Sequence, residues 1–193
     1  MRLLGLGLLV VGCGFRPTEV TALAPDAAFD ATLDAARDTS GPAERLVIEA
    51  EQFTTTTMPG ANAWTARTDQ AGFSGTAFMQ CGPGTGAYCP NDAALGICAA
   101  TLVYSLQIAT AGTYYVHVRG LAFGTSDDSV WYGVDGPAAA DSLDLIHDSQ
   151  WHWTTGATTY TLAAGAHTLT IWQRECGARA DVVAVTPSAI PPS

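Results

Sequence analysis

The chain of 193 residues carries 18 acidic and 8 basic side chains, a net charge of −10, and contains no lysine. This charge argues against nucleic acid as a partner, because the phosphate backbone attracts basic surfaces. It also argues against a polybasic contact with anionic lipid. The length allows one domain of ordinary size with a tail.

The N-terminus is predicted to be a secretory signal. Met1-Arg2 supplies one positive charge, and the apolar run from Leu3 to Val11 leads to Gly12 and Cys13. This order is typical of a signal peptide, and the run is far shorter than the roughly 20 residues of a membrane-spanning helix. A cysteine directly after a small residue resembles the lipobox of bacterial lipoproteins. That resemblance implies removal of residues 1–12, a diacylglyceryl group on Cys13 and an exported lipoprotein anchored at the outer membrane or cell surface. The alternative is an ordinary cleaved signal with a chance cysteine.

Residues 13–45 are predicted to be the lipidated cysteine and a linker. They are rich in Ala, Asp, Thr and Pro, and aspartates recur every four residues, at Asp26, Asp30, Asp34 and Asp38. On a helix these like charges would repel one another at i,i+4, so an extended, solvated spacer is favoured. A calcium loop is the alternative, but the Gly turn and closing Glu of an EF-hand are missing.

Short β runs fill the predicted domain at 46–187. They are rich in Val, Ile, Thr, Tyr and Trp and are separated by Gly, Pro, Asp and Ser. The predicted strands are residues 46–48, 76–80, 102–108, 113–121, 129–134, 143–146, 158–162, 167–172 and 180–186. The pattern predicts an all-β fold, a two-sheet β-sandwich of the jelly-roll kind, followed by a Pro-rich tail at 188–193.

Two runs show which side chains should face the core, because alternate residues of a strand point to opposite faces. The expected core faces carry Tyr114, Val116 and Val118 in one run, and Leu169 and Ile171 in the other. The opposite faces carry Tyr115, His117 and Arg119, and Thr168, Thr170, Trp172 and Arg174.

Four cysteines remain if Cys13 carries a lipid: Cys81, Cys89, Cys98 and Cys176. An even number in an exported protein predicts two disulfides, with three possible connectivities. We favour Cys89–Cys98 as a local pair and Cys81–Cys176 as a long-range pair. Zinc is the alternative, but the spacings lack the close cysteine pairs that zinc sites favour.

Several motifs, taken in order, resemble the galactose-binding-like jelly rolls of the family 6 and family 35 carbohydrate-binding modules. The resemblance covers about residues 46–187. The motifs are Ile48-Glu49-Ala50-Glu51, Gly75-Thr76-Ala77-Phe78, the run from Ala111 to Arg119, Ser129 to Gly136, Trp151-His152-Trp153, Ala164 to Glu175, and Ala180-Asp181-Val182-Val183.

The resemblance implies a structural calcium ion held by Glu49, Glu51 and Asp181. Glu49 and Glu51 are two apart in a predicted strand, so their carboxylates should share a face. First and last strands are often neighbours, which would bring Asp181 to them. Three crowded carboxylates repel one another, and Ca²⁺, which takes 6–8 oxygen ligands, would relieve this. The alternative is a solvated glutamate, with Asp181 paired to an arginine such as Arg45.

The resemblance also implies a sugar site at the loop end of the sandwich. Aromatic rings pack on the C–H faces of a sugar, and polar groups bind its hydroxyls. We expect Trp151 as one plane, Trp64 as the opposing plane and Arg179 as the polar contact. Family 6 modules usually have Asn at the position of Arg179. Core packing is the alternative for each Trp, and Trp172 is a second candidate platform unless a loop covers it.

The sequence therefore predicts a lipid-anchored, non-catalytic module that binds a polysaccharide or glycan, is stabilised by calcium and is monomeric. Catalysis is disfavoured because no nucleophile stands beside His147, Asp148 and His152. The alternative function is a surface scaffold or adhesion domain that binds protein rather than sugar.

Overall fold

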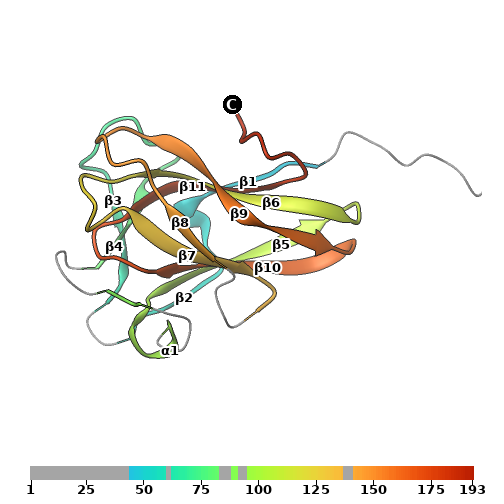
Figure 1. Cartoon of the computed structure of the whole chain (residues 1–193), viewed down its shortest axis with the longest axis horizontal. Coiled ribbons are helices and arrows are strands. Elements are labelled where there is room, and N and C mark those ends of the chain that lie inside the picture. The colour runs from blue at the N-terminus through green and yellow to red at the C-terminus, as the bar shows by residue number, and fades with distance from the viewer. Residues whose placement is uncertain (1–43, 60–61, 83–87, 91–94, 137–140) are drawn as a thin grey trace, which may run out of the picture. The chain divides into compact units, whose positions relative to one another are not determined.

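Two antiparallel β-sheets pack face to face in the computed structural model of the chain (Figure 1). The structure describes residues 44–59, 62–82, 88–90, 95–136 and 141–193. The predicted signal, Cys13 and nearly all of the linker lie outside these residues. Within the described segments, no helix is long and apolar enough to cross a membrane.

The first sheet contains six strands. Its order is β3 (Trp64–Arg67), β4 (Phe78–Cys81), β11 (Arg179–Thr186), β6 (Gly112–Leu121) and β9 (His152–Leu162). β1 (Leu46–Glu49) also pairs with β11, with Leu46 opposite Val185 and Glu49 opposite Val182. The first and last strands are therefore neighbours, as predicted. β1 begins beside the end of β11 that is remote from Arg179.

The second sheet contains five strands, in the order β2 (Thr55–Thr57), β5 (Thr101–Ile108), β10 (Gly165–Gln173), β7 (Ser129–Val134) and β8 (Asp141–Asp144). The only helices in the described segments are short, namely the 3-10 turn η1 (Ala50–Gln52) and α1 (Leu95–Cys98). This architecture confirms the predicted all-β, two-sheet β-sandwich. The short strands β2 and β3 were not predicted, and β8 begins two residues before the predicted run 143–146.

The core lies between the sheets and follows the predicted alternation. Tyr114, Val116 and Val118 of β6 are buried there, as are Leu169 and Ile171 of β10. The buried Tyr132 ring lies against Gly156 of β9, and its hydroxyl accepts a hydrogen bond from the backbone N–H of Thr158 at 3.0 Å. A Cβ at residue 156 would overlap this ring, so the close approach of β7 and β9 requires glycine.

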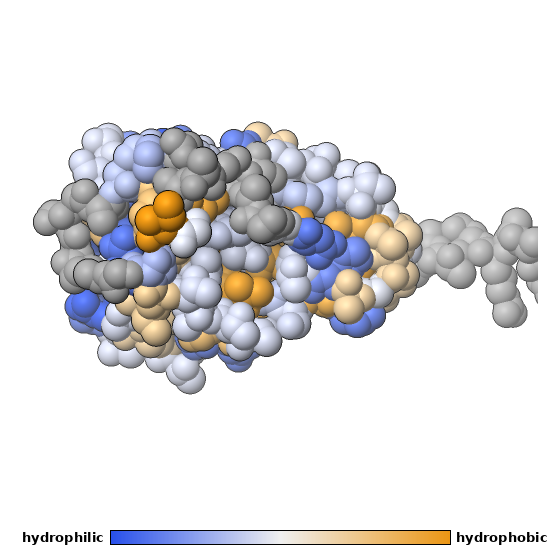
Figure 2. Space-filling model, turned by 90° about the horizontal axis from the view of Figure 1, so that it is seen from below, coloured by the Kyte–Doolittle hydropathy of each residue, from blue (hydrophilic) through white to orange (hydrophobic). Residues whose placement is uncertain are grey.

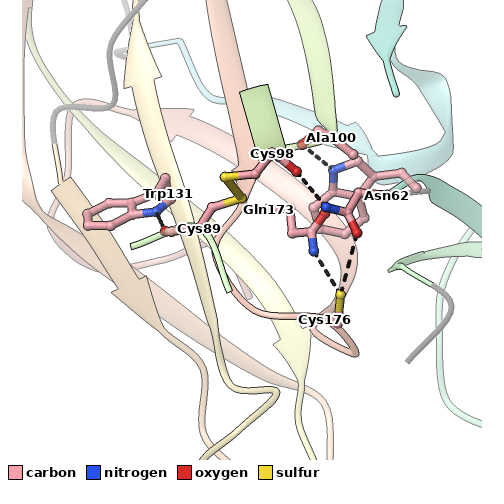
Figure 3. The surroundings of a disulfide bond; sticks show 8 residues. Asn62, Cys89, Cys98, Ala100, Trp131, Gln173 and Cys176 are labelled. Atoms are coloured by element: carbon pink, nitrogen blue, oxygen red, sulfur yellow. Dashed lines mark hydrogen bonds between the residues drawn. A yellow bond between two sulfur atoms is a disulfide. The ribbon is translucent and has the colours of Figure 1, made fainter. Parts of the chain in front are cut away.

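A segment closed by a disulfide covers part of the outer face of the five-stranded sheet (Figure 3). Cys89 is bonded to Cys98, which confirms the local pairing. Cys89, Leu95, Ala99 and Trp172 form a small buried cluster. Trp172 is only 5% exposed, so it is covered by this segment and is not a second sugar platform.

The predicted Cys81–Cys176 disulfide is wrong, because both residues are free thiols. Cys81 packs in the core between the sheets, where burial raises the pKa of its thiol. The sulfur of Cys176 instead accepts a hydrogen bond from Nε2 of Gln173 at 2.8 Å and lies 3.9 Å from Oδ1 of Asn62 (Figure 3). Both thiols are buried, and Cys176 lies close enough to Cys81 to add to the rise in its pKa, but no disulfide joins them.

Candidate functional site

Four connections meet at one end of the sandwich, on the left of Figure 1. They are residues 68–77, 122–128, 145–151 and 176–178, which we call the loop end. Backbone N–H of Ser149 donates to the carbonyl of Ala122 at 3.1 Å. Nε1 of Trp151 donates to the carbonyl of Ala71 at 2.9 Å. These bonds fix the loops relative to one another.

The three predicted calcium ligands meet around one of these loops. The hydroxyl of Ser74 donates to Oε2 of Glu49 at 2.7 Å and to Oδ2 of Asp181 at 3.3 Å. Backbone N–H groups of Thr76 and Ala77 donate to Oε1 of Glu51 at 2.7 and 3.3 Å. Glu51 lies in η1 rather than in a strand. The turn still brings its carboxylate beside that of Glu49.

Gly75 lies where these carboxylates converge. A Cβ on it would stand 2.5 Å from Oε1 of Glu51 and 3.0 Å from Oε2 of Glu49. Its φ of +65° is one that residues with side chains rarely adopt. Glycine is therefore required at this position, both by the backbone and by the two carboxylates.

The counter-charge at Asp181 comes from Arg119 rather than from Arg45. Asp181 is 0% exposed, and Nη1 of Arg119 forms an ion pair with its Oδ2. Burial raises the pKa of Asp181, although hydrogen bonds from Ser74 and Arg119 oppose this. Burial also acts to raise the pKa of Glu51, but the hydrogen bonds from Thr76 and Ala77 outweigh it and lower that pKa.

The oxygen-rich chemistry of this cluster suits a hard cation such as Ca²⁺. Oε2 of Glu51 is buried and has no hydrogen-bond partner among the described residues. As their side chains stand, however, no three His, Cys, Asp or Glu residues in the described segments form a group arranged to hold a metal ion. The donors fit calcium in type, and Arg119 supplies positive charge beside Asp181.

The three predicted sugar-binding residues do not form one cleft. Trp64 is 6% exposed, and its Nε1 donates to the carbonyl of Ala100 at 3.0 Å. The prediction that Trp64 is an opposing sugar plane is therefore wrong. It lies opposite Cys81 in the β3–β4 pairing and faces the core.

Trp151 is half-buried at the loop end. Its ring meets Phe78 edge-on, with centroids 5.3 Å apart. The guanidinium carbon of Arg119 lies 5.7 Å from its centroid, which is the range of a cation–π contact. Through Arg119, which also pairs with Asp181, Trp151 lies next to the carboxylate cluster of Glu49, Glu51 and Asp181.

Arg179 lies beneath an aromatic ring that the sequence analysis did not identify. Its guanidinium carbon is 4.2 Å from the centroid of Phe123, and Nη1 is 3.6 Å from Oδ2 of Asp127. Phe123 itself is 50% exposed. The available sequence signal was an aromatic residue in a Gly- and Ser-containing loop, but its contact with Arg179 depends on the fold.

His147 and His152, the two histidines considered for catalysis, each contact a carboxylate at the surface. Nε2 of His152 is 2.9 Å from Oδ2 of Asp148, and Nδ1 of His147 is 3.1 Å from Oδ2 of Asp128. In the described part of the chain, neither imidazole has a hydroxyl or thiol as a hydrogen-bond partner. This arrangement does not provide a nucleophile with its base.

No family model matches the chain, and no curated protein matches it. Solved structures do. A family 35 carbohydrate binding module from Clostridium thermocellum matches with a TM-score of 0.53 and 15% identity, over 74% of this chain and 98% of that one. CBM35 from Paenibacillus barcinonensis matches with a TM-score of 0.53 and 21% identity, over 74% of this chain and 99% of that one.

A third match is the Podospora anserina GH26-CBM35 beta-(1,4)-mannanase. Its TM-score is 0.55 at 20% identity, over 77% of this chain and 28% of the mannanase. At these identities the likeness shows the fold alone. The chain thus shares the jelly-roll sandwich fold of these modules, the fold that the sequence pattern predicted.

Proposed function

We propose that this protein is a non-catalytic carbohydrate-binding module, held at the cell surface by a lipid on Cys13 and stabilised by calcium at Glu49, Glu51 and Asp181. The likeness in fold to family 35 modules supports the carbohydrate ligand. The lipid rests on the signal pattern before Cys13, and the calcium rests on the convergence of the three carboxylates.

One observation carries the proposal. The loop end presents aromatic rings, with Phe123 half-exposed and Trp151 half-buried, next to guanidinium and carboxylate groups. Sugar-binding sites combine these elements, because a pyranose has apolar C–H faces and hydroxyls that require donors and acceptors. The loop end therefore offers both kinds of contact on one surface.

A glycan array followed by affinity electrophoresis of the full chain tests the function. We expect retardation in gels containing at least one plant, bacterial or host polysaccharide. Trp151→Ala should weaken it, whereas Ile97→Ala should not, because Ile97 is 79% exposed on α1, outside the loop end. Failure of the unaltered chain to bind any glycan would refute the proposal.

The alternative is a scaffold or adhesion domain that binds protein. The burial of Trp64 favours it, because a sugar cleft with two facing planes is not formed by the predicted pair. The exposed Phe123 and Ile146, in neighbouring loops, would then contact a partner protein. The outer face of the five-stranded sheet gives it less support, since Figure 2 shows only separate orange areas among paler surface on the described part of this face.

A further inference from the structure

Phe123 is exposed yet fixed in position. Asp127 accepts hydrogen bonds from the backbone N–H groups of Phe123 and Gly124, at 3.3 and 2.8 Å. Asp127 also pairs with Arg179, whose guanidinium lies against the Phe123 ring. One carboxylate thus holds both the backbone of the loop and the cation beneath the ring.

This support leaves part of the ring available for a ligand. Arg179 is only 12% exposed in its side chain, so it fills the space on one side of Phe123, while half of Phe123 remains accessible. A ring that is already held in place loses little conformational entropy when a ligand covers it. Such a ring is suited to stacking on the C–H face of a sugar.

The charges around Arg179, the cation beneath the ring, balance locally. Arg179 is paired with Asp127, and Arg67 forms a bidentate pair with Asp69. Arg179 also donates from Nη1 to the carbonyl of Gly177 at 3.1 Å. Each of the two guanidinium groups is thus paired with a carboxylate. The chain as a whole carries a net charge of −10. A carboxylated sugar would therefore meet repulsion from the chain as a whole without an uncommitted cation at this site to offset it.

We propose that Phe123 is the stacking platform of the glycan site and that its ligand is an uncharged pyranose unit. The inference rests on the proposed carbohydrate-binding function and names the ligand class and its principal contact. It assigns Arg179 to supporting the ring rather than to binding an acidic sugar.

Affinity electrophoresis and calorimetry of the full chain test this inference with two neutral polysaccharides, laminarin and galactomannan, and two acidic ones, polygalacturonate and alginate. We expect binding to a neutral polysaccharide, with an affinity that changes little between 50 and 500 mM salt. Over this range the Debye length falls from about 14 to about 4 Å, so an interaction between charges would weaken. Phe123→Ala should weaken binding about tenfold, which corresponds to about 1.4 kcal/mol. Phe123→Tyr keeps the ring and should bind like the unaltered chain.

The outcomes separate the inference from the function on which it rests. If Phe123→Ala melts like the unaltered chain and binds glycan equally well, the platform is refuted and the function stands. Salt-sensitive binding to the acidic polysaccharides alone would refute the uncharged ligand. If the unaltered chain binds no glycan on the array or in these gels, the function fails, and the inference fails with it.

Discussion

Replacing Arg119 with methionine tests how the carboxylate cluster of Glu49, Glu51 and the buried Asp181 is held together. Arg119→Met keeps much of the side-chain volume but removes the ion pair with Asp181. It also removes the hydrogen bond from Nη2 to the carbonyl of Gly72 at 3.1 Å and the cation over Trp151. Among the described residues, Asp181, which is 0% exposed, would keep only its bonds from Ser74.

The expected loss of stability is about 3 kcal/mol. Two unit charges about 4 Å apart interact by about 4 kcal/mol at an effective dielectric constant of about 20, and breaking a buried pair costs about 3–5 kcal/mol. The side chain of Arg119 is 25% exposed, so solvent already screens part of the pair and the lower value applies. For a domain of this size the melting temperature should fall by about 6–12 °C.

The loss should depend on pH in a defined direction. Burial raises the pKa of Asp181, and removal of Arg119 should raise it further. A carboxyl whose pKa is higher in the folded state contributes stability below its unfolded pKa, about 3.9, and that stability is lost as pH rises through the folded pKa. The difference between Arg119→Met and the unaltered chain should therefore be smallest below about pH 4 and grow toward neutral pH.

Urea and thermal unfolding followed by circular dichroism between about pH 3.5 and 7.5, in buffer containing EDTA, measures this difference. Arg67→Met is the matched control, because Arg67 pairs with Asp69 on the surface, with 44% of its side chain exposed, and such pairs contribute about 1 kcal/mol or less. Adding Asp181→Asn to Arg119→Met should recover part of the loss. An equal loss at every pH, or no greater loss than in Arg67→Met, would refute this account of the cluster.

Three further predictions concern the metal, the core and the anchor. If calcium binds the carboxylates, calcium about 100-fold above its dissociation constant should add about 2.7 kcal/mol to the free energy of unfolding. EDTA should then lower the melting temperature, and Glu51→Gln should abolish the difference between calcium and EDTA. An unchanged melting temperature in EDTA contradicts the site. Gly156→Ala should destabilise the fold by about 1–3 kcal/mol in urea unfolding, because Tyr132 occupies the space of a Cβ, whereas Gly96→Ala, which has nothing within 4 Å of the added Cβ, should not. In detergent phase partitioning, Cys13→Ser should move the protein from the detergent to the aqueous phase, and an unaltered protein found in the aqueous phase argues against the lipid.

The fold class was predictable because alternation repeats along whole strands. The Thr-rich β2 and the short β3 lack such a pattern, and their place is set by pairing with β5 and β4. The position of Asp181 near Glu49, with Ser74 bonded to both, followed from neighbouring first and last strands. Its partner Arg119 lies on β6, and no local spacing identifies that pair. The same limit applies to Phe123, whose support by Arg179 joins distant parts of the chain.

Tryptophan positions were the least predictable part of the site. Trp64 and Trp151 both follow polar or small residues, at or directly before the start of a strand, yet Trp64 lies in the core and Trp151 on the loop end. Which face of a short strand turns inward depends on its register, here the pairing of Trp64 with Cys81. A shift of one residue would reverse the face, and the sequence of a four-residue strand does not fix it.

The pairing of β1 with β11 also determines at which end of the sandwich the N-terminal linker is attached. β1 begins opposite Val185 and runs toward Val182, whereas the loop end lies beyond Arg179 at the other end of β11. A tether that precedes Leu46 therefore joins the sandwich at the end opposite the loop end. If Cys13 anchors the chain, the attachment point lies away from the loop end, so the tether does not block those loops.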